Sequence, residues 1–514
     1  MHLLILLALP VILYLTKSIL QLLYTTWKSP SLLSIPGPFL ARFTRLWYFT
    51  RVWKGHFEAD NLELHARYGP VVRIAPGQYS ISDRAAVKTV YGTGSRFPKS
   101  AWYEGWKHPS PDRWTLFPDR NIKRHAETRK RFSSLYSMSS LLHYEEFVDQ
   151  CADIFRQRLT EFAQSGQTFD LHHWLQCYAF DVIGDITFGQ RFGFLDRGDD
   201  IEGAMAALQK VMAYGTLVGI YPEWHPRLYE PLSRFTSSGP AGRSFVMRFV
   251  AEKIRQLNET RKTQPQPQDN PTTPLKTQDF MEKMALARDK DPEKVTDYHL
   301  FMMGNSNVIA GSDTTAISLS AILYHLLRNP ATWARLRHEV DDFTAQQQQQ
   351  QPQITFKESQ AMPYLQAVMK EAIRMHAATG LPLWREVPAG GATISGYFFP
   401  EGSVVGVNIW VAHYDEGVFP DAQRFRPERW LEAESGDPAR LQTMNEMYMP
   451  FGLGSRTCLG KHISILEMSK LIPQIVRDFD FQLEKRTWET DNKWFVKPLD
   501  FYVKVSMRQR ESVR

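Results

Sequence analysis

Apolar residues recur at helical spacing along most of the chain, and this pattern predicts a mainly helical protein. The clearest runs cover residues 144–162, 171–188 and 296–329, and the last and longest is closed by Pro330. A proline cannot continue a helix, so this run has a defined end. Short alternating runs at 71–74 and 79–81 flank a Pro-Gly pair and predict a β-hairpin. We therefore expect a mainly α fold with small β-sheets.

The N-terminus carries the most hydrophobic stretch of the chain. Residues 3–15 are apolar apart from a single proline, and a second apolar run covers residues 19–24. A bilayer-spanning helix needs roughly 20 residues, so the two runs together predict a membrane anchor at residues 1–28. Lys17 and Lys28 follow the apolar residues, which by the positive-inside tendency leaves the rest of the chain in the cytosol. A cleaved signal peptide is the alternative, but no basic segment precedes the apolar run.

Beyond the anchor, the sequence predicts a hinge and one large domain. Residues 29–40 form a proline-rich hinge, because proline fixes φ and restricts the residue before it. Nothing marks a division of residues 41–514 into two cores, so they are expected to form a single domain. Residues 264–279, with four prolines, are expected to be a linker, and the glutamine run at 346–351 an exposed insertion.

Composition and charge exclude several classes of protein. Three cysteines in 514 residues are too few for a disulfide framework, which favours a reducing compartment. The net charge of +6 is mild and spread along the chain, so no nucleic-acid-binding stripe is expected. Basic clusters at 123–124 and 129–131 are either a solvated helix face or a landing patch for an acidic electron-donor protein.

One cysteine stands in a segment punctuated by glycines, Phe451–Gly460. Gly452 and Gly454 allow a tight turn that a residue with a Cβ would strain. The segment runs into an amphipathic helix, whose N-terminal N–H groups and dipole favour the thiolate of Cys458. This arrangement provides an anionic sulfur ligand, whereas a buried structural cysteine after a glycine turn is the alternative interpretation.

The neighbours of this cysteine suit a large flat ligand. Phe451 can shield the sulfur from water, and Gly460 lets the following helix lie against a flat group. Arg456 is placed to meet a carboxylate of that group with the paired geometry that a guanidinium offers.

The longest predicted helix has a weak point at Ala310–Thr315. Glycine within a helix costs about 1 kcal/mol relative to alanine, and adjacent threonines add to that cost. A threonine hydroxyl bonded to the carbonyl four residues earlier can open a polar notch there. A simple glycine kink is the alternative. Further along, Glu371 and Arg374 share one helical face in apolar surroundings, which indicates a buried ion pair.

Together these segments resemble the motifs of the haem-thiolate monooxygenases, the cytochrome P450 family. In chain order the four matching motifs are Ala310–Thr315, Glu371–Arg374, Phe425–Trp430 and Phe451–Gly460. The resemblance covers nearly the whole chain after the anchor. It implies that family's fold, a helical domain with a long central helix over haem b. The segments 391–396 and 412–415 look like fungal microsomal members, the pisatin demethylase-like group.

The resemblance also implies a role for individual residues. Cys458 is the axial thiolate ligand of the haem iron, and Asp313 and Thr314 deliver protons to bound dioxygen. The other cofactor-binding residues are His125, Arg129, Arg385, Phe451, Arg456 and Gly460. Glu371, Arg374 and Arg429 support the cysteine loop structurally. The substrate pocket is expected to be lined by Trp102, Asn305, Ile309, Ala310, Thr379, Leu381 and Phe495.

The implied reaction inserts one oxygen atom from O2 into a lipophilic small molecule. A fungal secondary metabolite, such as a terpenoid, alkaloid or polyketide, is the expected substrate. Electrons come from NADPH through NADPH–cytochrome P450 reductase, because the chain shows no flavin or nicotinamide fingerprint. The expected location is the endoplasmic reticulum membrane, with one span and a cytosolic catalytic domain. The alternatives are a thiolate-haem isomerase or dehydratase that needs no reductase, and a non-catalytic haem-binding protein.

Overall fold

The structure is a computed structural model of the whole chain. It describes residues 30–137, 142–263, 278–346 and 353–509, together with residues 16, 20 and 140. The predicted anchor at 1–28, apart from residues 16 and 20, and most of the predicted linker and glutamine run therefore lie outside the described residues. Within the described part, no helix combines the length and apolar character needed to cross a bilayer.

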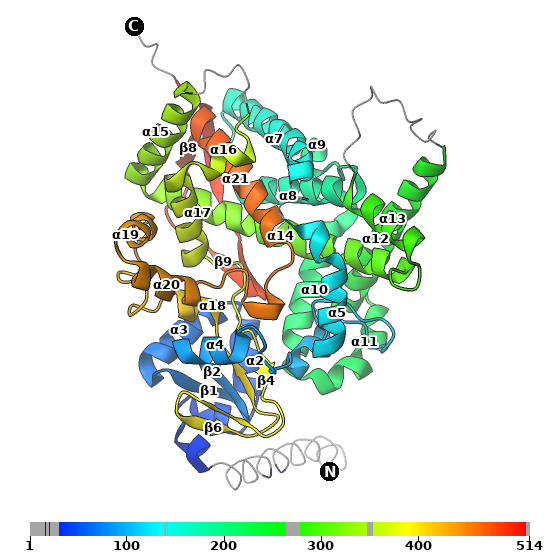
Figure 1. Cartoon of the computed structure of the whole chain (residues 1–514), viewed down its shortest axis with the longest axis vertical. Helices are drawn as coiled ribbons and strands as arrows, with labels where there is room; N and C mark the ends of the chain where they lie inside the picture. Colours follow the sequence, from blue (N-terminus) through cyan, green and yellow to red (C-terminus); the bar gives the residue numbers. More distant parts are fainter. Residues whose placement is uncertain are drawn as a thin grey trace, which may run out of the picture.

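Long helices form the larger part of the molecule, and α14 runs through its centre (Figure 1). The longer helices are α7 (Glu145–Ser165), α8 (Leu171–Phe188), α10 (Ala204–Val218), α12 (Gly239–Thr263), α14 (Asp297–Arg328), α15 (Pro330–Gln346), α17 (Pro363–Met375) and α21 (Lys461–Asp478). The most extensive packing is between α14 and α8, and α21 also packs against α14. The main hydrophobic core lies among α7, α8, α14, α17 and α21.

Shorter helices complete the helical part. They are α2 (Leu46–Trp53), α3 (Phe57–Tyr68), α4 (Arg84–Tyr91), α5 (Ile122–Phe132), α9 (Phe194–Arg197), α11 (His225–Ser233), α13 (Phe280–Lys290), α16 (Phe356–Gln360), α18 (Ile409–His413), α19 (Glu428–Gly436) and α20 (Pro438–Met447). Short 3-10 helices include η2 (Phe39–Arg42), η3 (Ala101–Trp106), η7 (Pro222–Trp224) and η8 (Gly454–Arg456). Of these, η3 is rich in aromatic side chains, and Trp102, Tyr103 and Trp106 on it are buried.

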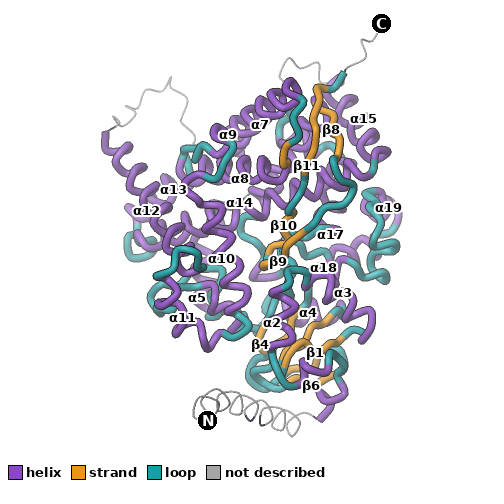
Figure 2. Tube along the Cα trace, turned by 180° about the vertical axis from the view of Figure 1, so that it is seen from behind, coloured by secondary structure: helices purple, strands orange, loops and turns teal. Residues whose placement is uncertain are grey.

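The strands form small sheets, which Figure 2 shows in orange at one end and through the middle of the molecule. The strands are β1 (Val71–Ala75), β2 (Gln78–Ile81), β3 (Phe169–Asp170), β4 (Arg385–Glu386), β5 (Ala392–Ile394), β6 (Tyr397–Phe399), β7 (Val404–Gly406), β8 (Phe479–Leu483), β9 (Thr490–Lys493), β10 (Phe495–Pro498) and β11 (Tyr502–Met507). Their orders are β1-β2-β7-β4, β3-β11-β8, β5-β6 and β10-β9. The expected mainly α fold with small sheets is confirmed.

Local signals in the sequence define the central helix. Thr296 caps α14 with its hydroxyl, and the side chain of His299 bonds back to the Thr296 backbone N–H, which completes a capping box. The helix ends at Arg328, just before Pro330. Gly311 lies against α8, where a Cβ would come within 2.7 Å of Ile183. Glycine therefore serves close helix packing here as well as the notch predicted from the sequence.

Candidate active site

The cysteine loop precedes α21 and turns as its glycines predict. Gly452 and Gly454 have φ of +67° and +59°, the left-handed region that favours glycine. A Cβ on Gly454 would lie 2.0 Å from the carbonyl oxygen of Tyr91, so the loop also needs glycine for its contact with α4. The backbone N–H of Cys458 donates to the carbonyl of Phe451 at 2.7 Å, which closes the loop around the sulfur.

The pKa of the Cys458 thiol differs in direction from the sequence expectation. Burial raises the pKa of the thiol, although hydrogen bonds from the backbone N–H groups of Gly460 and Lys461 and the charge of Arg129 act to lower it. The helix N-terminus alone therefore does not produce a thiolate, because desolvation opposes it more strongly. A metal cation bound to the sulfur would reverse that balance, since a coordinating thiol loses its proton.

The Cys458 sulfur lies deep in the protein and yet is not covered by other side chains. Ala310 is likewise exposed, although it lies in the middle of α14, whose other central residues are mostly buried. The hydroxyl of Thr314 donates to the carbonyl of Ala310 at 2.7 Å, which is the bond expected at the notch. Thr314 and Ala310 thus share one face of α14.

Asp313 points to another side of α14. The side-chain amide of Gln176, from α8, donates to its carboxylate, and the Lys497 ammonium of β10 lies 3.5 Å from the same oxygen. Neither partner had been identified from the sequence, because each comes from an element far from α14 in the chain.

Contacts between α14 and α21 hold the notch and the cysteine loop in one framework. The hydroxyls of Thr315 and Ser464 are 3.2 Å apart. Glu467, one turn further along α21, is buried and its carboxyl also bonds to Thr315, and burial raises its pKa well above the usual range. Its neutral form is therefore favoured, which avoids a buried charge between the two helices.

Five basic side chains from four segments gather beside this framework, two of them from α5. They are Lys99, His125, Arg129, Arg385 and Arg456, and we call them the cation cluster. In the described part of the chain none of the five makes an ion pair. Burial, reinforced by the neighbouring cations, lowers the pKa of Lys99 well below its usual value, that of Arg456 to about 10 and that of His125 to about 3.

Asp119, the carboxylate whose charge acts on Lys99, His125 and Arg456, is already engaged. Asp119 accepts two bonds from Arg124, at 2.7 and 2.8 Å, and offers Arg456 only its backbone carbonyl. One guanidinium nitrogen of Arg456 is buried and has no hydrogen-bond partner among the described residues. Buried cations without anions are costly, so the cluster requires an anionic ligand.

These features fit haem b. The uncovered Cys458 sulfur supplies an iron ligand, and the cation cluster matches the two propionates of the porphyrin. A Cβ added to Gly460 would meet no atom within 4 Å, so the start of α21 presents an open surface. The sequence had indicated four of the five cations. It gave no sign of Lys99, which follows Pro98 in an aromatic segment and is brought in by its bridge to Arg385.

Glu371, Arg374 and Arg429 form a fully buried ion-pair network behind the cysteine loop. Arg374 donates two bonds to the Glu371 carboxylate, at 2.9 and 3.0 Å, and Arg429 donates a third at 2.9 Å. The indole N–H of Trp430 donates at 3.0 Å to the same carboxylate, an addition that sequence reasoning missed. Arg374 also donates to the carbonyl of His413, whose ring accepts from the backbone N–H of Met449, just before the loop.

Most of the expected substrate-pocket residues come together. Trp102, Leu381, Ile309 and Phe495 belong to or pack against one apolar cluster, and Thr379 pairs with Phe495. Asn305 lies on α14 and is buried, and its side-chain oxygen has no hydrogen-bond partner in the part of the chain that the structure describes. The structure thus assembles residues from η3, α14, the segment before β4, and β10 on one side of the notch.

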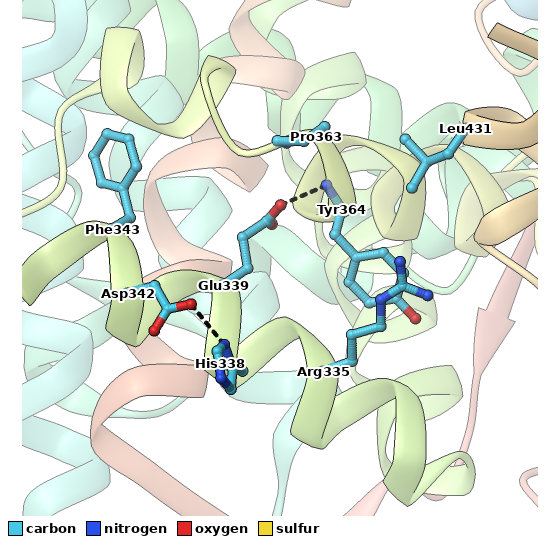
Figure 3. A pocket seen from close by; sticks show the side chains of 8 residues that line it. All are labelled: Arg335, His338, Glu339, Asp342, Phe343, Pro363, Tyr364 and Leu431. Carbon is cyan, nitrogen blue, oxygen red and sulfur yellow. Dashed lines mark hydrogen bonds and ion pairs between the residues drawn. The ribbon is translucent and has the colours of Figure 1, made fainter. Parts of the chain in front are cut away.

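A surface pocket of about 400 Å³ lies elsewhere, between α15 and α17 (Figure 3). Its polar groups are already paired. Glu339 accepts bonds from the backbone N–H groups of Tyr364 and Leu365, and so caps α17, while His338 pairs with Asp342. This pocket is therefore a helix-capping arrangement on the surface and not a reaction site.

Comparison with known proteins agrees with the geometry. A family model described as Cytochrome P450 matches residues 36–505. A pisatin demethylase of Fusarium vanettenii is 39% identical over 486 residues, covering 94% of this chain and 90% of that protein. A cytochrome P450 monooxygenase of Aspergillus terreus is 37% identical over 459 residues, covering 87% and 89%. Another, from Penicillium aethiopicum, is 32% identical over 486 residues, covering 92% and 93%.

Proposed function

The chain belongs to the cytochrome P450 family and is a haem-dependent monooxygenase, and on this premise we propose that it oxidises a lipophilic fungal secondary metabolite with electrons from NADPH, passed by a separate reductase. The observation that carries the proposal is the uncovered Cys458 sulfur beside a buried cation cluster that lacks anions. Similarity to fungal monooxygenases over more than nine-tenths of the chain supports the choice of substrate class.

Haem b, bound through the Cys458 thiolate, supplies the chemistry of dioxygen activation. The chain's own residues bind and orient the cofactor. Arg129, Arg385, Arg456 and Lys99 would hold its carboxylates, and a ring N–H of His125 would donate to them.

We assign proton delivery to Thr314 and Asp313. The Thr314 hydroxyl is held by the carbonyl of Ala310 on the accessible side of α14, where it can pass a proton to a ligand at the notch. Asp313 immediately precedes Thr314 in the chain, and its carboxylate contacts the Lys497 ammonium. The Lys497 side chain is about one-fifth exposed, so Asp313 lies between the notch and solvent. Proton supply then comes through the protein and not from bulk water.

Thr314→Ala tests this assignment. The variant is expected to bind haem and consume NADPH and O2, but the fraction of O2 that appears in product should fall about 10- to 100-fold because the proton donor is lost. Peroxide release and product are measured together. Ser312→Ala is the matched control: Ser312 also donates to the carbonyl four residues earlier, at 3.1 Å, but is fully buried. Equal coupling in both variants would contradict the role of Thr314.

The reaction itself is tested by expressing the chain with a reductase and adding an extract of secondary metabolites. A product that gains one oxygen atom, and forms only with NADPH and reductase, supports the proposal. Turnover without the reductase would instead favour a thiolate-haem isomerase or dehydratase, and haem binding with no turnover would favour a carrier.

We also propose that the protein lies at the endoplasmic reticulum membrane with its catalytic domain in the cytosol. Two groups of exposed apolar side chains support this: Phe39, Leu40, Leu46 and Trp53 on η2 and α2, and Trp224, Leu228 and Phe235 around α11. Arg45 joins the two groups, since it bonds to the carbonyl of Ile220 at 2.8 Å and pairs with Glu223. One apolar face of this kind suits a lipid surface.

The membrane proposal predicts how the full chain fractionates. It should sediment with microsomes and stay there after alkaline carbonate washing, because the sequence predicts a membrane anchor at residues 1–28. Recovery of the active enzyme in the soluble fraction would contradict it.

A further inference from the structure

One arginine stands in α12 at a position where the helical pattern calls for an apolar residue. Arg243 precedes Val246 and Val250 by one and two helical turns, so the three side chains share one face of the helix. That face is buried: Arg243 is 7% exposed, Val246 2% and Val250 0%. The start of α12 also packs closely on α10, because a Cβ on Gly242 would lie 2.7 Å from the carbonyl oxygen of Ala207. Helix packing thus encloses a charged side chain.

Arg243 has no counter-ion in the part of the chain that the structure describes, and it makes no hydrogen bond there. Burial lowers its pKa, and the only groups whose charges oppose that change are Tyr214 and Tyr229. The charges of Asp112 and Glu230 act on neighbouring rings but not on Arg243, and both side chains are exposed. A buried cation without an anion is costly, so the position favours an anionic ligand.

Four rings from three segments lie around this arginine. The ring centroids of His108 and Tyr229 are 5.0 Å apart, those of Tyr229 and His225 5.5 Å, and those of His225 and Tyr214 5.7 Å. Burial lowers the pKa of both histidines, and the charge of Arg243 lowers it further, which places the guanidinium beside these rings. The rings come from the segment after η3, from α10 and from α11.

Two donors at the edge of this group face one another without an acceptor. The backbone N–H of Ser110 donates to Nδ1 of His108 at 3.1 Å, so the proton of the neutral ring is on Nε2. This Nε2 lies 3.5 Å from a guanidinium nitrogen of Arg113, which has no lone pair with which to accept a bond. An anion at this point would accept from both groups. The observation is independent of the burial of Arg243 and indicates the same kind of ligand.

The surroundings of the arginine are already in place. Nδ1 of His225 accepts from the hydroxyl of Tyr214 at 2.9 Å, and Nε2 donates to the carbonyl of Lys107 at 3.0 Å. A carbonyl can only accept, so these two bonds fix both the ring orientation and its neutral form. They tie α10, α11 and the segment after η3 together. A ligand would therefore bind with little cost of ordering the site.

We propose that these residues form a binding site for a phosphate group. We call it the Arg243 site, and its members are His108, Arg113, Tyr214, His225, Tyr229 and Arg243. Arginine is suited to phosphate, and donors that come from both α12 and the segment after η3 suit oxygens arranged as a tetrahedron. None of these residues belongs to the cation cluster or to the expected substrate pocket. The site is thus separate from the haem chemistry.

Two sources can present this chemistry, a phospholipid of the membrane and free inorganic phosphate. Trp224 and Leu228 are 51% and 40% exposed, and in the chain they adjoin His225 and Tyr229 of the site. Apolar surface beside a phosphate site suits the acyl chains of a lipid. We therefore expect a phospholipid to bind more tightly than phosphate alone.

The test follows the thermal unfolding midpoint of the haem-loaded full chain, which a ligand that binds only the folded state raises. The probes are inorganic phosphate, dihexanoyl phosphatidic acid as a dissolved monomer, and dihexanoylglycerol, which has the chains without the phosphate. Chloride keeps the ionic strength equal. We expect phosphatidic acid to bind about tenfold more tightly than phosphate, because its chains bury apolar surface, and dihexanoylglycerol to leave the midpoint unchanged. Equal affinity for the first two probes would support the site and assign it to free phosphate.

Variants separate the Arg243 site from general charge. Arg243→Met removes the charge and should weaken both phosphate probes about tenfold, because charge-assisted hydrogen bonds are lost. Without a ligand its midpoint should be equal or higher, since an unpaired buried cation is gone. Arg227→Met is the matched control, because Arg227 is an exposed arginine on α11, and it should change neither affinity. His108→Phe keeps a ring beside Tyr229, removes the Nε2 donor and should weaken both probes about threefold.

Unchanged phosphate affinity in Arg243→Met would overturn the proposal. Equal losses in Arg243→Met and Arg227→Met would do the same, because binding would then respond to net charge alone. A midpoint raised as much by dihexanoylglycerol as by phosphatidic acid would show that the phosphate is not recognised. The carbon monoxide spectrum of each variant shows that the cysteine-ligated haem is intact. These affinities are measured by unfolding, so they are independent of monooxygenase turnover.

Discussion

Cys458→Ala is expected to abolish monooxygenase turnover while leaving a folded protein. The sulfur is the only group in the loop that can bind iron as an anion, and its side chain is not covered by others, so its removal disturbs little packing. Without it, any haem retained by the cation cluster lacks the electron-donating axial ligand that O–O cleavage needs. Product formation with reductase, circular dichroism and the reduced carbon monoxide spectrum are measured on the same preparation.

Cys177→Ala provides the matched control. Cys177 is buried on α8, with its sulfur 3.7 Å from a ring nitrogen of His173, and it takes no part in the site. This variant should keep its spectrum and turnover. If Cys458→Ala were to turn over at the normal rate, the role of this sulfur would be excluded.

Glu371→Ala is expected to give little haem-loaded protein. The carboxylate is fully buried and accepts bonds from two fully buried arginines and from Trp430. Its loss leaves two guanidinium groups without an anion, and breaking a buried pair in this way costs about 3–5 kcal/mol. This is a large share of the stability of a typical domain. Haem content per chain and the midpoint of thermal unfolding are the measurements.

An exposed pair serves as the control for this variant. Glu252 pairs with Arg255 on the surface of α12, where both side chains are well exposed. Glu252→Ala should leave haem content and the unfolding midpoint unchanged, because solvent screens such pairs. Normal haem loading in Glu371→Ala would remove the structural account of the network.

The sequence predicts well those elements whose signals are local. The apolar pattern at 171–188 coincides with α8, and the pattern at 296–329 differs from α14 by one residue at each end, because a Thr cap and Pro330 mark its limits. The Gly452 and Gly454 turn also follows from the residues alone. The helix N-terminus was expected to favour the Cys458 thiolate, and hydrogen bonds from the backbone N–H groups of Gly460 and Lys461 do act in that direction, but desolvation outweighs them and raises the pKa of the thiol.

Contacts between distant segments could not be predicted. Lys99 joins the cation cluster because its backbone forms an isolated β-bridge with Arg385. Gln176 and Lys497 meet Asp313 from elements more than 130 residues away on either side. Trp494 reaches three other tryptophan or phenylalanine rings because the β9–β10 turn folds over η3. Such partners depend on the register of whole elements, which single residues and their spacing do not encode.

The central claim is that the sulfur of Cys458 binds haem iron as a thiolate. The most direct test is the absorption spectrum of the purified, unaltered full chain, reduced and exposed to carbon monoxide. The account predicts the long-wavelength Soret band of a thiolate-ligated haem at one haem per chain. A folded protein that binds no haem, or whose band lies where imidazole-ligated haems absorb, would contradict it.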